Sequence, residues 1–153
     1  MTHVPVKAPP TGWTVLCIHA LPDGQSRLVD IELPVTRKVE NADGSSHWEG
    51  IAPARVWGLA GGGSTLGYSA WHTCGEAGLS ITLRGRWQIE ASDGECRELG
   101  PGDVLVMLDT SGQGHRSWPQ EGEDAAMVMG IGFGEGVEAQ MRARLAHALA
   151  ARD

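Results

Sequence analysis

The sequence predicts an all-β domain followed by one helix, and three observations support this. Glycine occurs 22 times in 153 residues, roughly twice the usual frequency of about 7%, and without low-complexity repeats. Short segments rich in β-forming residues are separated by turn signals about every 8–12 residues, which is typical of a sandwich or barrel. Helical spacing of apolar residues is confined to the end of the chain.

Composition and charge exclude several classes of protein. The chain has 12 Lys and Arg against 19 Asp and Glu, a net charge of −7, which argues against binding to nucleic acid or an anionic membrane. Its apolar runs are too short to span a bilayer, and its start lacks the features of a secretion signal. We therefore expect one cytoplasmic domain over 1–153, with a barrel at about 14–134 and a helix at about 136–151.

The first half of the chain predicts an extended arm and several short strands. Residues 1–12 contain three prolines and read as the arm. Alternation of Val29, Ile31 and Leu33 with acidic residues indicates a half-buried strand. The remaining segments are an apolar strand at 14–18, a turn at 22–24, a polar loop at 40–50, a strand at 55–59, a glycine connector at 61–64 and an extended segment at 66–72.

The second half has the clearer pattern. Apolar and polar residues alternate in 79–83 and in 87–91, and Asp93-Gly94 after the second run is a strong hairpin signal. Further strands are predicted at 104–108, 115–118 and 125–133. Val137, Met141, Leu145, Ala148 and Leu149 recur at helical spacing, so we expect a helix that packs on the barrel or on a second subunit.

One predicted strand carries glycine on a single face. Gly130, Gly132 and Gly134 alternate with Met129, Ile131 and Phe133. Glycine weakens a strand, so three in register suggest that something approaches this face closely. The favoured interpretation is a neighbouring backbone or a bulky core side chain, and the alternative is space for a ligand.

Residues 14–134 resemble the cupins. The resemblance rests on Trp71-His72, Leu83-Arg84-Gly85, Gly100-Pro101-Gly102-Asp103 and Gly112-Gln113-Gly114-His115, and within the cupins it is closest to a group of small bacterial single-domain proteins. It implies a double-stranded β-helix, that is, a jelly-roll barrel with a pocket in its mouth, and a homodimer. It also implies that His72 and His115 point into that pocket.

The resemblance supplies only part of a cupin metal site. His72 and His115 match the first and last histidines of the pattern, but Cys74 stands in place of the second histidine and Gly78 in place of the carboxylate. His72, Cys74 and His115 could hold zinc, iron, nickel or copper, with Glu76 replacing the missing carboxylate. The alternative is that no metal is bound and that Cys74 is a small apolar residue.

Without a metal, His72 and His115 could act as a general acid and a general base near neutral pH. Such a pair suits isomerisation, elimination or cyclisation of a carbonyl compound, and it favours these reactions over dioxygenase chemistry. Asp109 could orient an imidazole, although an Asx turn is the favoured interpretation. Tyr68, Trp57, Trp87 and Arg55 are the candidate substrate-binding residues.

Three functions remain open from the sequence. The first is a small-molecule enzyme that uses His72 and His115. The second is a module that binds or senses a metabolite without catalysis, and the third is a degenerate barrel whose alanine-rich terminal helix mediates oligomerisation. Phosphate-loop and nucleophile-elbow motifs do not occur.

Overall fold

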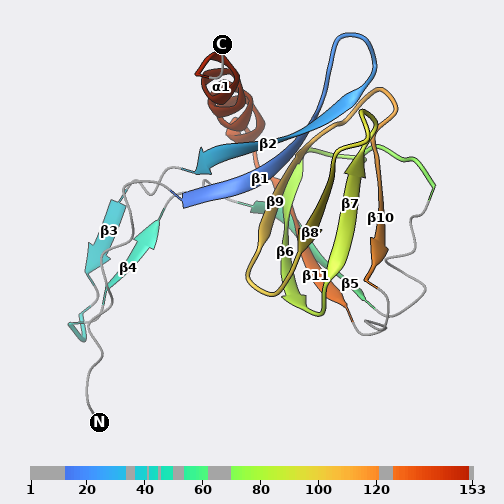
Figure 1. Ribbon diagram of the computed structural model, residues 1–153. Coiled ribbons are helices and arrows are strands. Elements are labelled where there is room, and N and C mark those ends of the chain that lie inside the picture. Colours follow the sequence, from blue (N-terminus) through green and yellow to red (C-terminus); the bar gives the residue numbers. More distant parts are fainter. Residues whose placement is uncertain are drawn as a thin grey trace.

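The computed structural model describes residues 13–33, 37–40, 42–44, 46–49, 54–61, 70–120 and 126–151, with the backbone alone at 13, 37–39, 46–49 and 54–61. These residues form an all-β protein with one C-terminal helix (Figure 1), as predicted. The strands are β1 (Trp13–Ala20), β2 (Ser26–Leu33), β3 (Arg37–Glu40), β4 (Ser46–Glu49), β5 (Ala54–Gly61), β6 (Gly78–Arg84), β7 (Trp87–Ala91), β8 (Cys96–Leu99), β9 (Val104–Leu108), β10 (His115–Pro119) and β11 (Met127–Phe133). The helix is α1 (Val137–Ala150).

The first half of the chain departs from the predicted elements at one loop. The polar loop expected at 40–50 is wrong in part, because Ser46–Glu49 forms β4 and pairs with β3. Trp48 and Val39 are β-forming residues inside an otherwise polar stretch, and their contribution outweighs its loop-like composition. The expected N-terminal arm and most of the glycine connector and of 66–72 lie outside the described residues.

Two sheets form the body of the fold. The larger has the order β2-β1-β9-β6-β11-β5, and the smaller has the order β10-β7-β8. Apolar side chains from both sheets share one core, which includes Ile18, Leu105 and Val128 from the larger and Trp87 and Ile89 from the smaller. We call the space between them the inter-sheet space.

On the opposite face of the larger sheet lies α1, which packs mainly over β2. Val137, Met141 and Leu145 recur every four residues and pack with apolar side chains of β1, β2, β6 and β9. Alternate residues of each strand therefore serve two cores, since successive side chains point to opposite faces. Of the two positions expected for the helix, the structure shows the one against the sheet.

The strand pairing from β5 onward has the form of one long hairpin folded between two sheets. The innermost pair is β7 with β8, the next is β6 with β9, and the outermost is β5 with β11, all antiparallel. Between the last two lies an antiparallel bridge that joins His72 to His115. Successive nested pairs alternate between the smaller and the larger sheet.

Candidate functional site

The centre of the candidate site is a buried pair formed by Asp109 and His115. Asp109 directly follows β9, and His115 is the first residue of β10. Oδ2 of Asp109 lies 2.6 Å from Nδ1 of His115, and the two side chains are 0% and 6% exposed. A carboxylate only accepts hydrogen bonds, so Nδ1–H of His115 is the donor and Nε2 carries the free lone pair. The structure thus shows Asp109 beside an imidazole, rather than in the Asx turn favoured from the sequence.

His72 is held against His115 by the main chain. Each residue's N–H donates to the other's carbonyl oxygen, at 2.9 Å from His72 and 2.8 Å from His115. The ring centroids are 4.4 Å apart and the rings are inclined by 57°. Nδ1 of His72 lies 3.0 Å from the carbonyl oxygen of Ala70. The two histidines expected to act together therefore lie side by side.

The loop before His115 can take this course only with glycine at one position. Gly114 has a φ of +72°, and a Cβ atom there would overlap the carbonyl oxygen of His72. This φ lies in the left-handed region that only glycine adopts at little cost. Gly114 thus permits the close approach of the two chain segments that carry the histidines.

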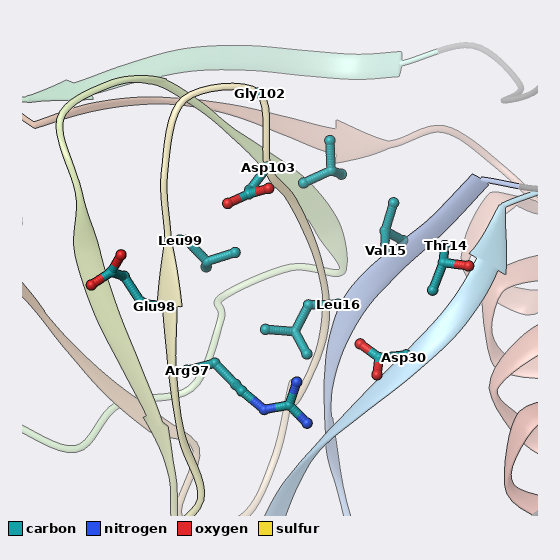
Figure 2. A pocket seen from close by; sticks show the side chains of 10 residues that line it. Thr14, Val15, Leu16, Asp30, Arg97, Glu98, Leu99, Gly102 and Asp103 are labelled. Carbon is teal, nitrogen blue, oxygen red and sulfur yellow. The ribbon is translucent and has the colours of Figure 1, made fainter. Parts of the chain in front are cut away.

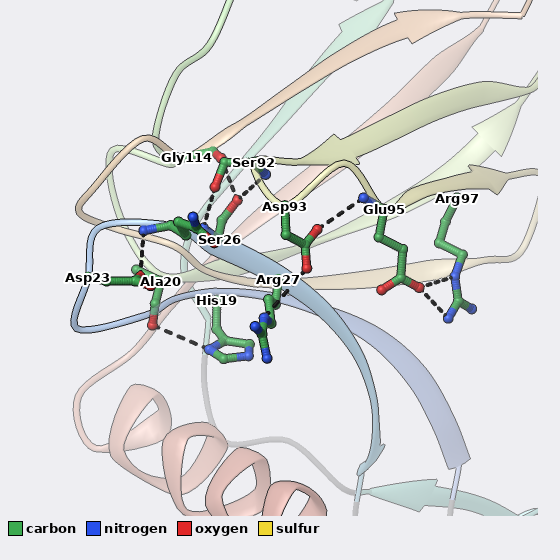
Figure 3. A network of polar contacts seen from close by, with 11 residues as sticks. His19, Ala20, Asp23, Ser26, Arg27, Ser92, Asp93, Glu95, Arg97 and Gly114 are labelled. Atoms are coloured by element: carbon green, nitrogen blue, oxygen red, sulfur yellow. Dashed lines mark hydrogen bonds and ion pairs between the residues drawn. The ribbon is translucent and has the colours of Figure 1, made fainter.

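Ser26, the first residue of β2, is hydrogen-bonded to the same loop. Its hydroxyl donates to the carbonyl oxygen of Gly114 at 2.6 Å and accepts the N–H of Ser92 at 2.8 Å. The Ser26 N–H donates to the Ser92 hydroxyl at 2.6 Å. Figure 3 shows these bonds tying together the start of β2, the turn after β7 and the start of β10. Ser26 is fully buried and Ser92 is half-buried, so Ser26 holds the loop from inside the fold.

Cys74 lies near the carboxylate of Asp109, but it is held as a thiol. Burial raises its pKa, and the charge of Asp109 and a hydrogen bond to that side chain raise it further. Oδ1 of Asp109 is itself buried without a partner in good hydrogen-bond geometry, so this contact is a weak one. A metal ligand must be a thiolate, and the surroundings of Cys74 oppose its formation.

The expected metal ligands do not fit a metal site in this arrangement. Across the described part of the chain, no three His, Cys, Asp or Glu side chains converge as ligands. Glu76, expected as a substitute carboxylate, is exposed and lines a hollow with Glu135 and Glu138 beside the start of α1. We therefore route no chemistry through a metal.

Of the four predicted substrate-binding residues, only Trp87 has a described side chain. Trp87 is buried between the sheets, but it lies four residues along β7 from Ala91, the partner of His115. Its indole N–H donates to Oγ1 of Thr82 at 2.8 Å, which is a packing role. Trp57 pairs with Ile131, on the strand position next to the Gly58–Gly130 pair. The side chains of Arg55 and Trp57, and all of Tyr68, lie outside what the structure describes.

A separate hollow lies at the other end of the inter-sheet space. It has a volume of about 240 Å³ and is bordered by Leu16, Leu99, Asp30, Arg97 and Asp103 (Figure 2). It adjoins Val104, the first residue of β9, whereas Asp109 comes directly after Leu108, the last residue of β9. Its lining contains neither histidine nor cysteine, so we do not place the acid–base chemistry there.

Arg116 faces away from the histidine pair, as strand alternation predicts. Its guanidinium lies 5.1 Å from the ring centroid of Trp71 and 5.6 Å from that of Trp118, and it forms an ion pair with Glu90 at 2.7 Å. His147 is exposed on the surface of α1, whereas Arg116 is half-buried.

Comparisons with known proteins give no family assignment. No protein-family model matches the chain, and no curated protein sequence matches it. Within the described residues, no helix has both the length and the apolar character needed to cross a membrane.

Proposed function

We propose that the protein is a small-molecule enzyme that transfers protons to and from a carbonyl compound, with His115 as the base. The observation that carries this proposal is the 2.6 Å contact between the buried Asp109 carboxylate and Nδ1 of His115. A carboxylate on one ring nitrogen fixes the tautomer and stabilises the imidazolium that forms when the other nitrogen takes a proton. Isomerisation, elimination and cyclisation all begin with such a step.

The proposed step conserves protons and electrons. Nε2 of His115 removes a proton from the carbon next to the carbonyl group, and the electron pair of the C–H bond forms the C=C bond of an enol while the π pair of the C=O bond moves to the oxygen. His72, when protonated, transfers its proton to that oxygen as negative charge develops there. In an isomerisation, His115 returns its proton to a different carbon and His72 recovers its own.

We also propose that the two sheets form the double-stranded β-helix of a cupin-type jelly roll. The nested order of strand pairs from β5 to β11, alternating between the two sheets, supports this assignment. β1 pairs in parallel with β9 and in antiparallel with β2. These two strands therefore extend the larger sheet beyond the nested pairs. The pocket at the mouth of such a barrel is where His72 and His115 would meet a substrate.

Proton exchange tests this function without knowledge of the natural substrate. A panel of small ketones and ketoacids in D₂O is incubated with the protein, and NMR records deuterium incorporation next to the carbonyl group. We expect catalysed exchange that falls about 10²–10⁴-fold in His115→Gln, the usual contribution of a general base. His147→Gln, on the exposed surface of α1, is the matched control and should retain full exchange.

Two outcomes would overturn the proposal. One is the absence of exchange above the buffer rate over the whole panel, and the other is unchanged exchange in a folded His115→Gln variant. Saturable binding without exchange would instead support the metabolite-binding alternative. Elemental analysis of protein purified without a metal-affinity tag adds a further check, because stoichiometric metal lost in His115→Ala would make His115 a ligand.

A further inference from the structure

The hydroxyl of Ser80 is buried and has no hydrogen-bond partner. Ser80 is 7% exposed, and its Oγ is among the buried side-chain atoms that remain unpaired. Thr82, two residues along β6 on the same face, pairs its hydroxyl with the indole of Trp87. Burying an unpaired hydroxyl costs on the order of 1–3 kcal/mol. A hydroxyl kept there at such a cost is available to a ligand.

Strand register places Ser80 on the inter-sheet side of the larger sheet. Ser80 pairs with Leu105 on one side and Gly130 on the other. Leu105 belongs to the core between the two sheets, whereas Leu79 belongs to the core under α1. Paired residues of adjacent strands point to the same face, so Ser80 and Gly130 face the inter-sheet space together.

Among the described residues, nothing fills the space over Gly130. A Cβ atom built on Gly130 would meet nothing within 4 Å, so the expectation that a backbone or bulky side chain fills this face is wrong at this residue. Gly130 is also only half-buried, although strands pair with it on both sides. Its other neighbour across the sheet is Gly58. The serine hydroxyl can turn toward this space by a change of its χ1 rotamer.

We propose that Ser80 and Gly130 form a ligand subsite in the inter-sheet space, where the Ser80 hydroxyl donates a hydrogen bond to a neutral carbonyl or hydroxyl oxygen. The buried polar residues of the described chain are His19, Ser26, Ser80, Thr82, Asp109, His115 and Ser117, with no lysine or arginine among them. A carboxylate or phosphate would lose its hydration there without a buried counter-charge, because Arg97, which borders the hollow beside Val104, is exposed and already forms an ion pair with Glu95. The ligand class is therefore an uncharged oxygen compound.

This subsite rests on the proposed function for its role, because it would bind the part of the substrate remote from the histidine pair. Ser80 is level with Leu105, and Asp109 lies four residues further along the chain from Leu105. At about 3.3 Å per residue this separates the two levels by roughly 13 Å along the strand direction. The subsite would therefore select substrates by their size and by an oxygen away from the reacting carbon.

Binding of cyclohexanone, followed by backbone amide NMR, tests the subsite. We expect saturable shifts at the amides of Gly130 and Gly132, and at least tenfold weaker binding of the anion cyclohexanecarboxylate. Ser80→Ala should weaken cyclohexanone binding about 3- to 10-fold, as for loss of one hydrogen bond. Gly130→Val should abolish binding while circular dichroism remains unchanged, because valine suits a strand and fills the open space.

Thermal unfolding of two serine variants gives a readout independent of any ligand. Ser80→Ala removes an unpaired hydroxyl, so the ligand-free protein should melt at the same or a higher temperature. Ser26→Ala is the matched control, because its hydroxyl makes two hydrogen bonds in an equally buried setting. That variant should melt several degrees lower.

The results separate this subsite from the proposed function. His115→Gln should lose proton exchange yet still bind cyclohexanone, since it leaves Ser80 and Gly130 intact. If exchange behaves as proposed but cyclohexanone shifts no inter-sheet amide, or Gly130→Val binds it normally, the subsite is wrong and the catalytic pair stands. A lower melting temperature in Ser80→Ala would also contradict it, since the hydroxyl would then have a structural partner.

Discussion

The two faces of the six-stranded sheet differ in how completely they are packed. The face under α1 is covered by apolar side chains from β1, β2, β6 and β9, and helix residues such as Met141 are 1% exposed. The inter-sheet face is well packed around Trp87 and Ile89 but has open space at Gly130 and an unpaired hydroxyl at Ser80. This difference is the basis of the subsite proposed at Ser80 and Gly130.

Polar chemistry is divided in the same way. Asp109, His115 and Ser80 lie on the inter-sheet side or at its end, whereas the buried polar residue on the helix side is His19. If this division is correct, changes on the inter-sheet side should affect activity more than stability. Changes on the helix side should show the reverse.

The largest expected effect is on activity, from Asp109→Asn. The amide keeps the size of the carboxylate but cannot stabilise an imidazolium, and it can hold His115 in the wrong tautomer. We expect ketone proton exchange to fall about 10²-fold or more, with a change in its pH profile. If Asp109 has a purely structural role, the variant should melt at a lower temperature but keep the pH profile of its remaining activity. That result would contradict the division of roles between the two faces of the sheet.

A second prediction concerns the helix face. Met141→Ala should lower the free energy of unfolding by about 2–5 kcal/mol, because it leaves a cavity in a fully buried core. Urea denaturation measures this change. Proton exchange per folded molecule should stay within about twofold of the original protein. A large loss of exchange in the folded variant would show that the helix face also supports the site.

The smallest expected effect is the pH dependence that His19 gives to stability. Burial lowers the pKa of His19 below 6.5, and the charges of Arg27 and Arg142 lower it further. The hydrogen bond to the carbonyl oxygen of Ala20 and the charge of Asp109 act in the opposite direction but do not outweigh burial. Because the unfolded chain binds the proton more readily, stability is full above pH 6.5 and falls as the pH drops toward the folded-state pKa.

The variant His19→Gln tests this assignment. It cannot titrate, so its stability should decline less between pH 7 and pH 5 than that of the original protein, as measured by urea denaturation. Equal declines in the two proteins would assign the acid sensitivity to other groups. The exposed His147 again offers the control substitution, since it lies on the solvent side of α1.

The sequence was most informative where local chemistry determines the structure. Turns such as Asp93-Gly94 and the alternation in 79–83 and 87–91 predicted the central strands. Alternation did not reveal that both faces of β6 are buried, because Ser80 and Thr82 look like ordinary solvent-facing residues. Whether a polar residue faces water or a second sheet depends on long-range packing, which no short pattern encodes.

The candidate site was predicted in the same uneven way. His72 and His115 could be paired from the cupin resemblance, and the structure brings them together. The contact between Asp109 and His115 joins residues at the two ends of one loop, so an Asx turn was an equally reasonable local interpretation. The signal that could have favoured the contact is an acidic residue directly after an entirely apolar strand.

The nested pairing of strands also implies an order in which the chain can assemble. Only residues 92–95 separate β7 from β8, so this pair closes the smallest loop and can form first, followed by β6 with β9. Closing a longer loop costs more entropy, and non-local contacts form slowly. His72 and His115 are 43 positions apart in the chain, since 115 minus 72 is 43. Their imidazoles would therefore meet late in folding, after the two inner strand pairs have formed.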